Sequence, residues 1–350
     1  MKRLSEQQIG SSQRQGNIEL LRIVCMLFVL IIHFNLNVIL RNESTSVLMN
    51  NIALVVNSFV IVAVNCFILI SGYFSIRLRI KSLVSFLFQV VFCSFIAVVI
   101  FLLQKMSQHE PVTIGYVIWV LLPFNAPNLW FVPSYFMLML VSPLLNLLCE
   151  RRWLHDIALW SALLCVFFCY GVYGYQGYSI YQFVVLYLLG RYIRLIKVEK
   201  LRLKRTLWFL LYLLSVAVTF VLAYSWVQRG HDVSDKMMYA YSSPWVMLSS
   251  VMFFIFFLTL NINRRWILLI SPSVFSVYLL HENGLINHLA YINPLRSVIA
   301  DSHTCYSDMY MYLVVLLYGV VLFMLIVIFD RFSRLSIYNY LYSRFSLSRK

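Results

Sequence analysis

Long, unbroken apolar runs constrain this chain more than any other feature. A helix that crosses a bilayer needs about 20 apolar residues, and inside lipid only helices or closed barrels satisfy the backbone polar groups. The runs show no alternation of apolar and polar residues with period two, so they predict helices and not barrel strands. The fold class predicted is an all-α integral membrane protein with about ten transmembrane helices. They are expected at 18–40, 51–74, 82–104, 128–148, 156–173, 178–196, 206–227, 240–260, 266–290 and 309–330.

Composition supports lipid as the solvent for most of the chain. Charged residues make up 12% of it and hydrophobic residues 62%, whereas a soluble domain carries about 25% charged residues. We expect one transmembrane domain at 18–330, a cytoplasmic N-terminal tail at 1–17 and a basic cytoplasmic C-terminal tail at 331–350. The apolar segment 114–123 is too short to span and is expected to be a short interfacial helix.

The distribution of Lys and Arg predicts the orientation. With the N-terminus placed inside, most of the 28 basic residues fall in the inside segments, and every inside segment is basic. This is the bias of the positive-inside rule, and it puts both termini in the cytoplasm. The net charge of +15 is therefore interpreted as an orientation signal, and no nucleic-acid partner is expected.

The first predicted helix carries three ionisable side chains: Glu19, Arg22 and His33. Such groups are costly inside a membrane, so each is a candidate functional residue. Glu19 and Arg22 are three residues apart and can pair, although an interfacial salt bridge would explain them equally well. Arg22 and His33 lie on one stripe of the helix, about 16 Å apart along its axis. A buried histidine is often only a packing residue, but its alignment with Arg22 favours a role in proton transfer.

The end of the second predicted helix holds a second candidate site. Ser71 and Gly72 permit close backbone approach and a local break, and Arg77, Arg79 and Lys81 follow on the predicted inner side. This pattern is typical of a phosphate-binding patch beside a helix gap. It is equally typical of a helix end followed by orientation signals.

Polar and aromatic side chains near the predicted outer face form a third candidate site. His281, Glu282 and Asn283 are consecutive in the ninth predicted helix, and Trp130 begins the fourth. The three polar residues indicate either a cavity open to the outside or an early helix end, and Trp130 is also typical of an interface aromatic. No spacing of His, Cys and carboxylates resembles a zinc site, so no metal is expected.

Several segments together resemble the membrane-bound acyltransferase family 3, which includes bacterial O-acetyltransferases of surface polysaccharides. The family's signature is an Arg, ten residues and a His in the first helix, here Arg22 and His33 in RIVCMLFVLIIH, with Glu19 as the usual preceding acid. FILISGYF, NLWFVPSYFMLMLVSPLLN and SVFSVYLLH also fit the family, in its order. One departure is that R-x-R-x-K replaces the common R-x-x-R pair at 77–81.

The resemblance implies an O-acyltransferase in the bacterial cytoplasmic (inner) membrane. Its donor would be acyl-CoA, with acetyl-CoA as co-substrate and no bound cofactor, and its acceptor a hydroxyl of a polysaccharide or lipid-linked glycan. The catalytic residues expected are His33, Arg22 and Glu19. The donor-binding residues expected are Arg77, Arg79, Lys81, Ser71 and Gly72. The acceptor-binding residues expected are Trp130, His281, Glu282 and Asn283.

A glycan transporter or flippase is the alternative interpretation, because buried charges can also form a substrate path. That class predicts acidic residues at mid-membrane and an internal repeat. The sequence shows neither, apart from Glu19 and Glu282 near helix ends. A polysaccharide polymerase or ligase predicts a large outer loop, whereas the longest one here, 105–127, is short and mostly apolar.

Overall fold

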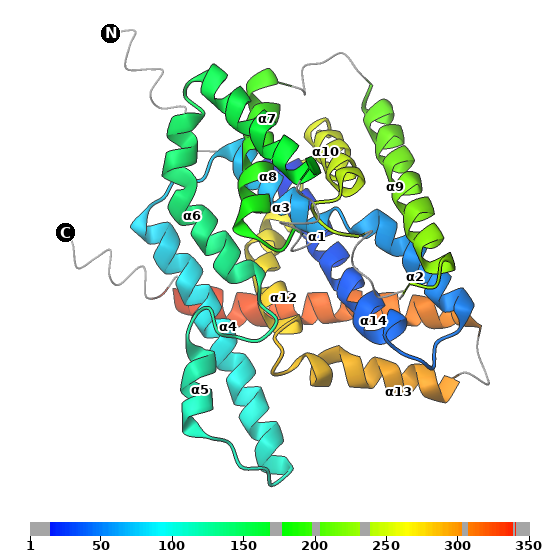
Figure 1. Cartoon of the computed structure of the whole chain (residues 1–350). Helices are drawn as coiled ribbons and strands as arrows, with labels where there is room; N and C mark the ends of the chain where they lie inside the picture. Colours follow the sequence, from blue (N-terminus) through cyan, green and yellow to red (C-terminus); the bar gives the residue numbers. More distant parts are fainter. Residues whose placement is uncertain are drawn as a thin grey trace, which may run out of the picture.

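The computed structural model describes residues 15–168, 177–197, 204–231, 239–302, 307–338 and 340. Every regular element in these ranges is helical, which confirms the all-α prediction for the described part of the chain. Helix α1 (Gly16–Phe34) runs through the middle of the bundle and packs on α2, α3, α10, α12 and α14 (Figure 1). The core therefore surrounds the helix that carries Glu19, Arg22 and His33.

The elements follow one another closely along the chain. The first half contains α1 (Gly16–Phe34), η1 (Asn35–Leu40), α2 (Val47–Val60), α3 (Ala63–Phe74), α4 (Ile80–Ser107), α5 (Ile114–Leu121), α6 (Phe131–Leu148) and α7 (Arg152–Phe168). The second half contains α8 (Ile180–Ile196), α9 (Arg205–Gln228), α10 (Pro244–Leu258), α11 (Arg265–Ile270), η3 (Ser271–Ser273), α12 (Val274–His281), η4 (His288–Ile292), α13 (Asn293–Ser302), α14 (Asp308–Asp330) and η5 (Arg331–Leu335).

A helix or helical run occupies each predicted range, within the described residues. Six of these stretches are long and apolar enough to cross a membrane by themselves. They are Gly16–Leu40, Val47–Phe74, Ile80–Ser107, Phe131–Leu148, Arg205–Gln228 and Asp308–Tyr338. The short helix expected at 114–123 is present as α5. The count of ten spans and the orientation stay predictions, and the predictions for 1–14, 169–173 and 341–350 lie outside the described residues.

The ninth predicted helix ends earlier than the sequence indicated. It was expected over 266–290, but a 3-10 turn with Pro272 interrupts it and α12 ends at His281. The chain then turns at Asn283 and Gly284, where the Gly284 amide donates to Pro127 O at 3.0 Å. A Cβ on Gly284 would lie 2.7 Å from the Cβ of Pro127, so this close approach needs glycine. The turn leaves Glu282 at a helix end and not within a helix.

Helices α3 and α8 pack closely through two glycines. A Cβ on Gly72 would overlap the carbonyl of Tyr187, and a Cβ on Gly190 would overlap that of Leu69. Small residues let helix backbones approach in this way inside membranes. The predicted close approach at Gly72 is confirmed, but the predicted local break there is wrong. Helix α3 continues to Phe74, and the chain leaves it at Ser75, where φ is 59°.

A buried ion pair joins α14 to α12 and α4. Arg334 donates from Nε and Nη2 to the carboxylate of Asp330 at 2.6 and 2.8 Å, and the side chains are 4% and 1% exposed. Ser276 on α12 also donates to Asp330 at 2.6 Å, and Gln89 on α4 donates to Ser276 at 2.7 Å. Because unpaired charges are costly away from water, this network fixes α12 against its neighbours.

Removal of one partner from the buried pair should be strongly destabilising. Asp330→Asn leaves the Arg334 charge buried without a carboxylate, and we expect a loss of about 3–5 kcal/mol in the free energy of unfolding. Titration of detergent-solubilised protein with dodecyl sulfate, followed by circular dichroism, measures this. The double variant Asp330→Leu/Arg334→Met should lose less than Asp330→Asn. A double variant as unstable as the sum of its single variants would contradict the assignment.

Gly72→Ala should lower the free energy of unfolding by about 1–3 kcal/mol, because the new methyl group overlaps the Tyr187 backbone. Gly115→Ala is the matched control, since nothing lies within 4 Å of a Cβ built there. The same titration compares the two. Equal stability of the Gly72→Ala and Gly115→Ala variants would show that α3 and α8 do not pack as described.

Candidate active site

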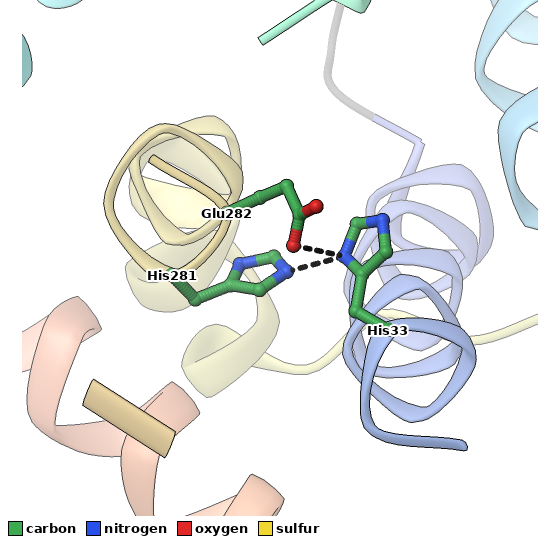
Figure 2. A group of neighbouring side chains, drawn as sticks. All are labelled: His33, His281 and Glu282. Atoms are coloured by element: carbon green, nitrogen blue, oxygen red, sulfur yellow. Dashed lines mark hydrogen bonds and ion pairs between the residues drawn. The ribbon is translucent and has the colours of Figure 1, made fainter. Parts of the chain in front are cut away.

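Three ionisable side chains meet between α1 and the end of α12 (Figure 2). His33 Nδ1 lies 2.9 Å from His281 Nε2 and 3.2 Å from Glu282 Oε2. His281 is fully buried and Glu282 is 9% exposed. The sequence placed His33 among the catalytic candidates and the other two among acceptor-binding candidates, whereas the structure joins them in one cluster.

The protons in this cluster can be assigned from the partners. His281 Nδ1 lies 2.6 Å from Val277 O, one turn earlier on α12. A carbonyl oxygen only accepts, so Nδ1 of His281 carries a proton, and in the neutral ring its Nε2 accepts. Glu282 Oε2 is also an acceptor, and His33 Nδ1–H therefore donates toward both His281 and Glu282. The hydrogen bonds thus select the Nδ1–H tautomer of His33.

This tautomer leaves a lone pair on Nε2 of His33. Figure 2 shows that Nε2 points away from both His281 and Glu282. A carboxylate behind one imidazole nitrogen orients the ring and stabilises the imidazolium that forms when the other nitrogen takes a proton. The arrangement is that of a general base whose proton-accepting atom faces away from its carboxylate.

Glu282 is itself held in place by a chain of hydrogen bonds. The hydroxyl of Tyr291 donates to Glu282 Oε2 at 3.1 Å and accepts from Asn37 Nδ2 at 2.8 Å. The Tyr291 ring stacks on Phe34 with centroids 4.6 Å apart. Sequence reasoning missed Tyr291, because it lies just after the predicted helix 266–290 and its contact with Glu282 depends on the turn that ends α12.

An apolar cavity of about 260 Å³ extends between Arg22 and His33. Both side chains line it, which confirms that they share one stripe of α1. Arg22 Nη1 donates to Glu19 Oε1 at 2.9 Å, so the predicted pair is confirmed too. The other lining residues are Met26, Val29, Ile32, Val64, Phe67, Ser71, Phe86, Trp130, Phe131, Tyr135, Tyr241, Ser271, Pro272, Val274, Phe275 and Tyr278.

A second, more polar cavity of about 380 Å³ lies on the other side of His33. Its walls are Ile32, His33, Leu36, Asn37, Arg41, Asn128, Trp130, Tyr178, Tyr241, Glu282, Asn287, His288, Ile292 and Arg296. Ile32, His33, Trp130 and Tyr241 line both cavities. The cluster therefore sits where an apolar and a polar cavity meet.

Only part of the predicted donor site reaches a cavity. Ser71 lines the apolar cavity and donates to Phe67 O at 2.9 Å. Gly72 instead contacts the Tyr187 backbone. Arg77, Arg79 and Lys81 are exposed between α3 and the start of α4, and they line neither of the two cavities.

The predicted acceptor residues also separate into two groups. Trp130 lines both cavities and Glu282 lines the polar one. His281 lies behind His33 and is fully buried. Asn283 is fully buried and lines neither cavity; its Oδ1 accepts from the Leu285 amide at 3.1 Å. Asn283 therefore shapes the turn after α12.

The ligand atoms of His33, His281 and Glu282 all lie within 4.8 Å of one another, close enough to hold a metal ion. A metal shared by the two rings would need a lone pair on both facing nitrogens. The hydrogen-bond partners assign a proton to Nδ1 of His33. A metal ion here would displace that proton, so the hydrogen-bonded cluster and a metal-bound cluster are mutually exclusive states of the three side chains.

Comparison with known proteins gives one family. The family model of acyltransferase family 3, described as an acyltransferase domain, matches residues 15–329 of this 350-residue chain. The match contains every residue that lines the two cavities. No curated protein and no solved structure matches the chain.

Proposed function

The chain belongs to acyltransferase family 3, and we propose that it transfers an acyl group from cytoplasmic acyl-CoA to a hydroxyl of a surface polysaccharide or its lipid-linked precursor. Acetyl-CoA is the proposed donor, and the bacterial cytoplasmic membrane the proposed location, with ten spanning helices and both termini inside. The observation that carries the proposal is the position of His33, which lies where the two cavities meet. Its hydrogen bonds to His281 and Glu282 assign it the Nδ1–H tautomer, which leaves Nε2 as a base.

We assign the apolar cavity to the donor. Arg22 lies at its far end, on the side that the positive-inside rule places in the cytoplasm. An apolar passage suits the pantetheine arm and the acyl group, whose thioester would reach His33. The exposed Arg77 and Arg79 would contact CoA phosphates, since no carboxylate lies within 4 Å of either among the described residues.

We assign the polar cavity to the acceptor. Its asparagine and tyrosine side chains suit the hydrogen bonding of sugar hydroxyls, and Trp130 supplies an aromatic wall at the junction. An acceptor hydroxyl beside His33 would then face the thioester in the other cavity. The two substrates would enter from opposite ends and meet at one imidazole.

The proposed reaction needs one base and no external redox partner. Nε2 of His33 takes the proton of the acceptor hydroxyl while that oxygen attacks the thioester carbonyl. The C–O bond forms, the C–S bond breaks, and the CoA thiolate takes the proton back from the His33 imidazolium. His281 and Glu282 act as positioning residues for His33, and Glu19 holds the Arg22 guanidinium.

His33→Ala should reduce acyl transfer by about 10²–10⁴-fold, because the general base is lost. Mass spectrometry of surface glycans from deletion and complemented strains measures it, with membrane protein levels compared by immunoblot. His109→Asn changes an exposed histidine outside both cavities and should leave acylation unchanged. Normal glycan acylation in the His33→Ala strain would contradict the proposal.

Glu282→Gln should lower kcat with little change in the KM for acyl-CoA. The amide keeps the size of the carboxylate, but it can donate to His33 Nδ1 and so select the wrong tautomer, which costs about 10⁴-fold in a comparable His–Asp pair. Thiol release from acetyl-CoA, measured with detergent-solubilised protein, reports both constants. Glu43→Gln, at an exposed carboxylate, is the control. A raised KM with normal kcat would instead place Glu282 in donor binding.

A further inference from the structure

The polar cavity carries two arginines that the proposed reaction does not use. Arg296 donates from Nε and Nη2 to Asn37 O at 3.0 and 2.6 Å, and Nη2 also approaches Arg41 O at 3.4 Å. These carbonyls belong to the π-helical turn η1 and the residue after it. Arg41 donates to Asn37 Oδ1 at 3.3 Å. Arg296 is thus fixed on the backbone at the wall of the cavity, with Arg41 beside it.

Neither arginine has a carboxylate partner within 4 Å among the described side chains. A guanidinium has five N–H donors, and within the described residues Nη1 of Arg296 makes no hydrogen bond. The carboxylate in the cavity wall, Glu282, already accepts from Tyr291 and pairs with His33. The cavity therefore has two positive charges that its own acid does not neutralise.

We propose that Arg41 and Arg296 bind an anionic group of the acceptor, so that the substrate is an acidic glycan. This inference rests on the proposed function. The shared chemistry is an oxyanion, either the carboxylate of a uronic acid or a phosphate on the sugar, which guanidinium groups bind through paired N–H donors.

The distance along α1 and η1 suits this role. Asn37, which holds both arginines, follows His33 by four residues, or about 6 Å along the helix. That separation is comparable to the width of one sugar ring. The anionic group and the reacting hydroxyl would then lie on the same sugar or on adjacent ones.

The aromatic wall supplies a surface for the ring between these two points. Trp130 packs edge-on against Tyr178, with centroids 4.4 Å apart, and stacks on Tyr241 at 5.9 Å. All three line the polar cavity. A flat aromatic face suits the C–H face of a pyranose, while the arginines take its charged substituent.

Binding to the detergent-solubilised full chain, measured by isothermal titration calorimetry, tests the inference without any acyl transfer. The probes are a glucuronate-containing tetrasaccharide against its carboxyl-reduced form, and N-acetylglucosamine 1-phosphate against N-acetylglucosamine. We expect the wild type to bind one charged probe at least about tenfold more tightly than its neutral partner, as for hydrogen bonds to charged groups. Preference for the uronate or for the phosphate identifies the source of the oxyanion.

Arg296→Gln and Arg41→Gln should abolish this preference, whereas Arg229→Gln, at an exposed arginine outside both cavities, should keep it. Arg41→Gln is included because it should not disturb folding: Arg41 is exposed and its side chain makes one hydrogen bond, at 3.3 Å. A wild type that binds neither charged probe better than its neutral partner overturns the inference. So does an unchanged preference in the two variants.

Charge preference and acyl transfer, measured separately, distinguish this inference from the proposed function. His33→Ala should still prefer the charged probe, although its acyl transfer falls by about 10²–10⁴-fold. A charge preference in a wild-type protein without acyl transfer would reject the function and keep the anion site. Acyl transfer by a wild type without any charge preference would keep the function and reject the anion site.

Discussion

The hydrogen bond from His33 Nδ1 toward Glu282 and His281 is the interaction on which the rest of the site depends. It joins α1 to the end of α12, and it sets which nitrogen of His33 carries the proton. The Val277 carbonyl fixes a proton on Nδ1 of His281, and Tyr291 donates to Glu282. Each hydrogen bond in this network therefore has a defined donor and acceptor. In a medium that offers little water, such a network holds a single arrangement, because any reversed bond leaves a buried group unsatisfied.

The surrounding helices keep the two ends of this interaction at a fixed separation. The buried pair of Asp330 and Arg334 is tied to α12 through the hydrogen bond from Ser276 to Asp330, while the turn at Gly284 closes on the loop before α6. Close approach of α3 and α8 at Gly72 lies outside the site, and α3 also packs on α1. Each contact pairs a polar group or brings two backbones together. These are the interactions that stabilise helix packing where lipid removes the hydrophobic driving force between helices.

Two cavities of different character meet at one side chain. The cavity toward Arg22 is mainly apolar, and the one beyond His33 has polar walls with Arg41 and Arg296. A transferase must hold two substrates so that only their reacting atoms meet, because proximity and orientation supply much of the rate. The proposed donor and acceptor sites would satisfy this because they lie in two different cavities that meet at His33. The proposed anion site extends the same logic by fixing which hydroxyl of the acceptor reaches His33.

The sequence by itself determined that lipid surrounds much of the protein, that the fold class is all-α, and that Arg22 and His33 share one stripe of α1. These follow from runs of apolar residues and from spacing within one helix, both of which are local. The resemblance to acyltransferase family 3 also indicated acyl transfer, which the match of the family model supports. Only the tertiary structure decided that His281 and Glu282 lie against His33, and that Arg296 donates to the carbonyl of Asn37. Those contacts join residues about 250 positions apart, and they depend on the rotation and depth of each helix against its neighbours, which no spacing along a single helix encodes.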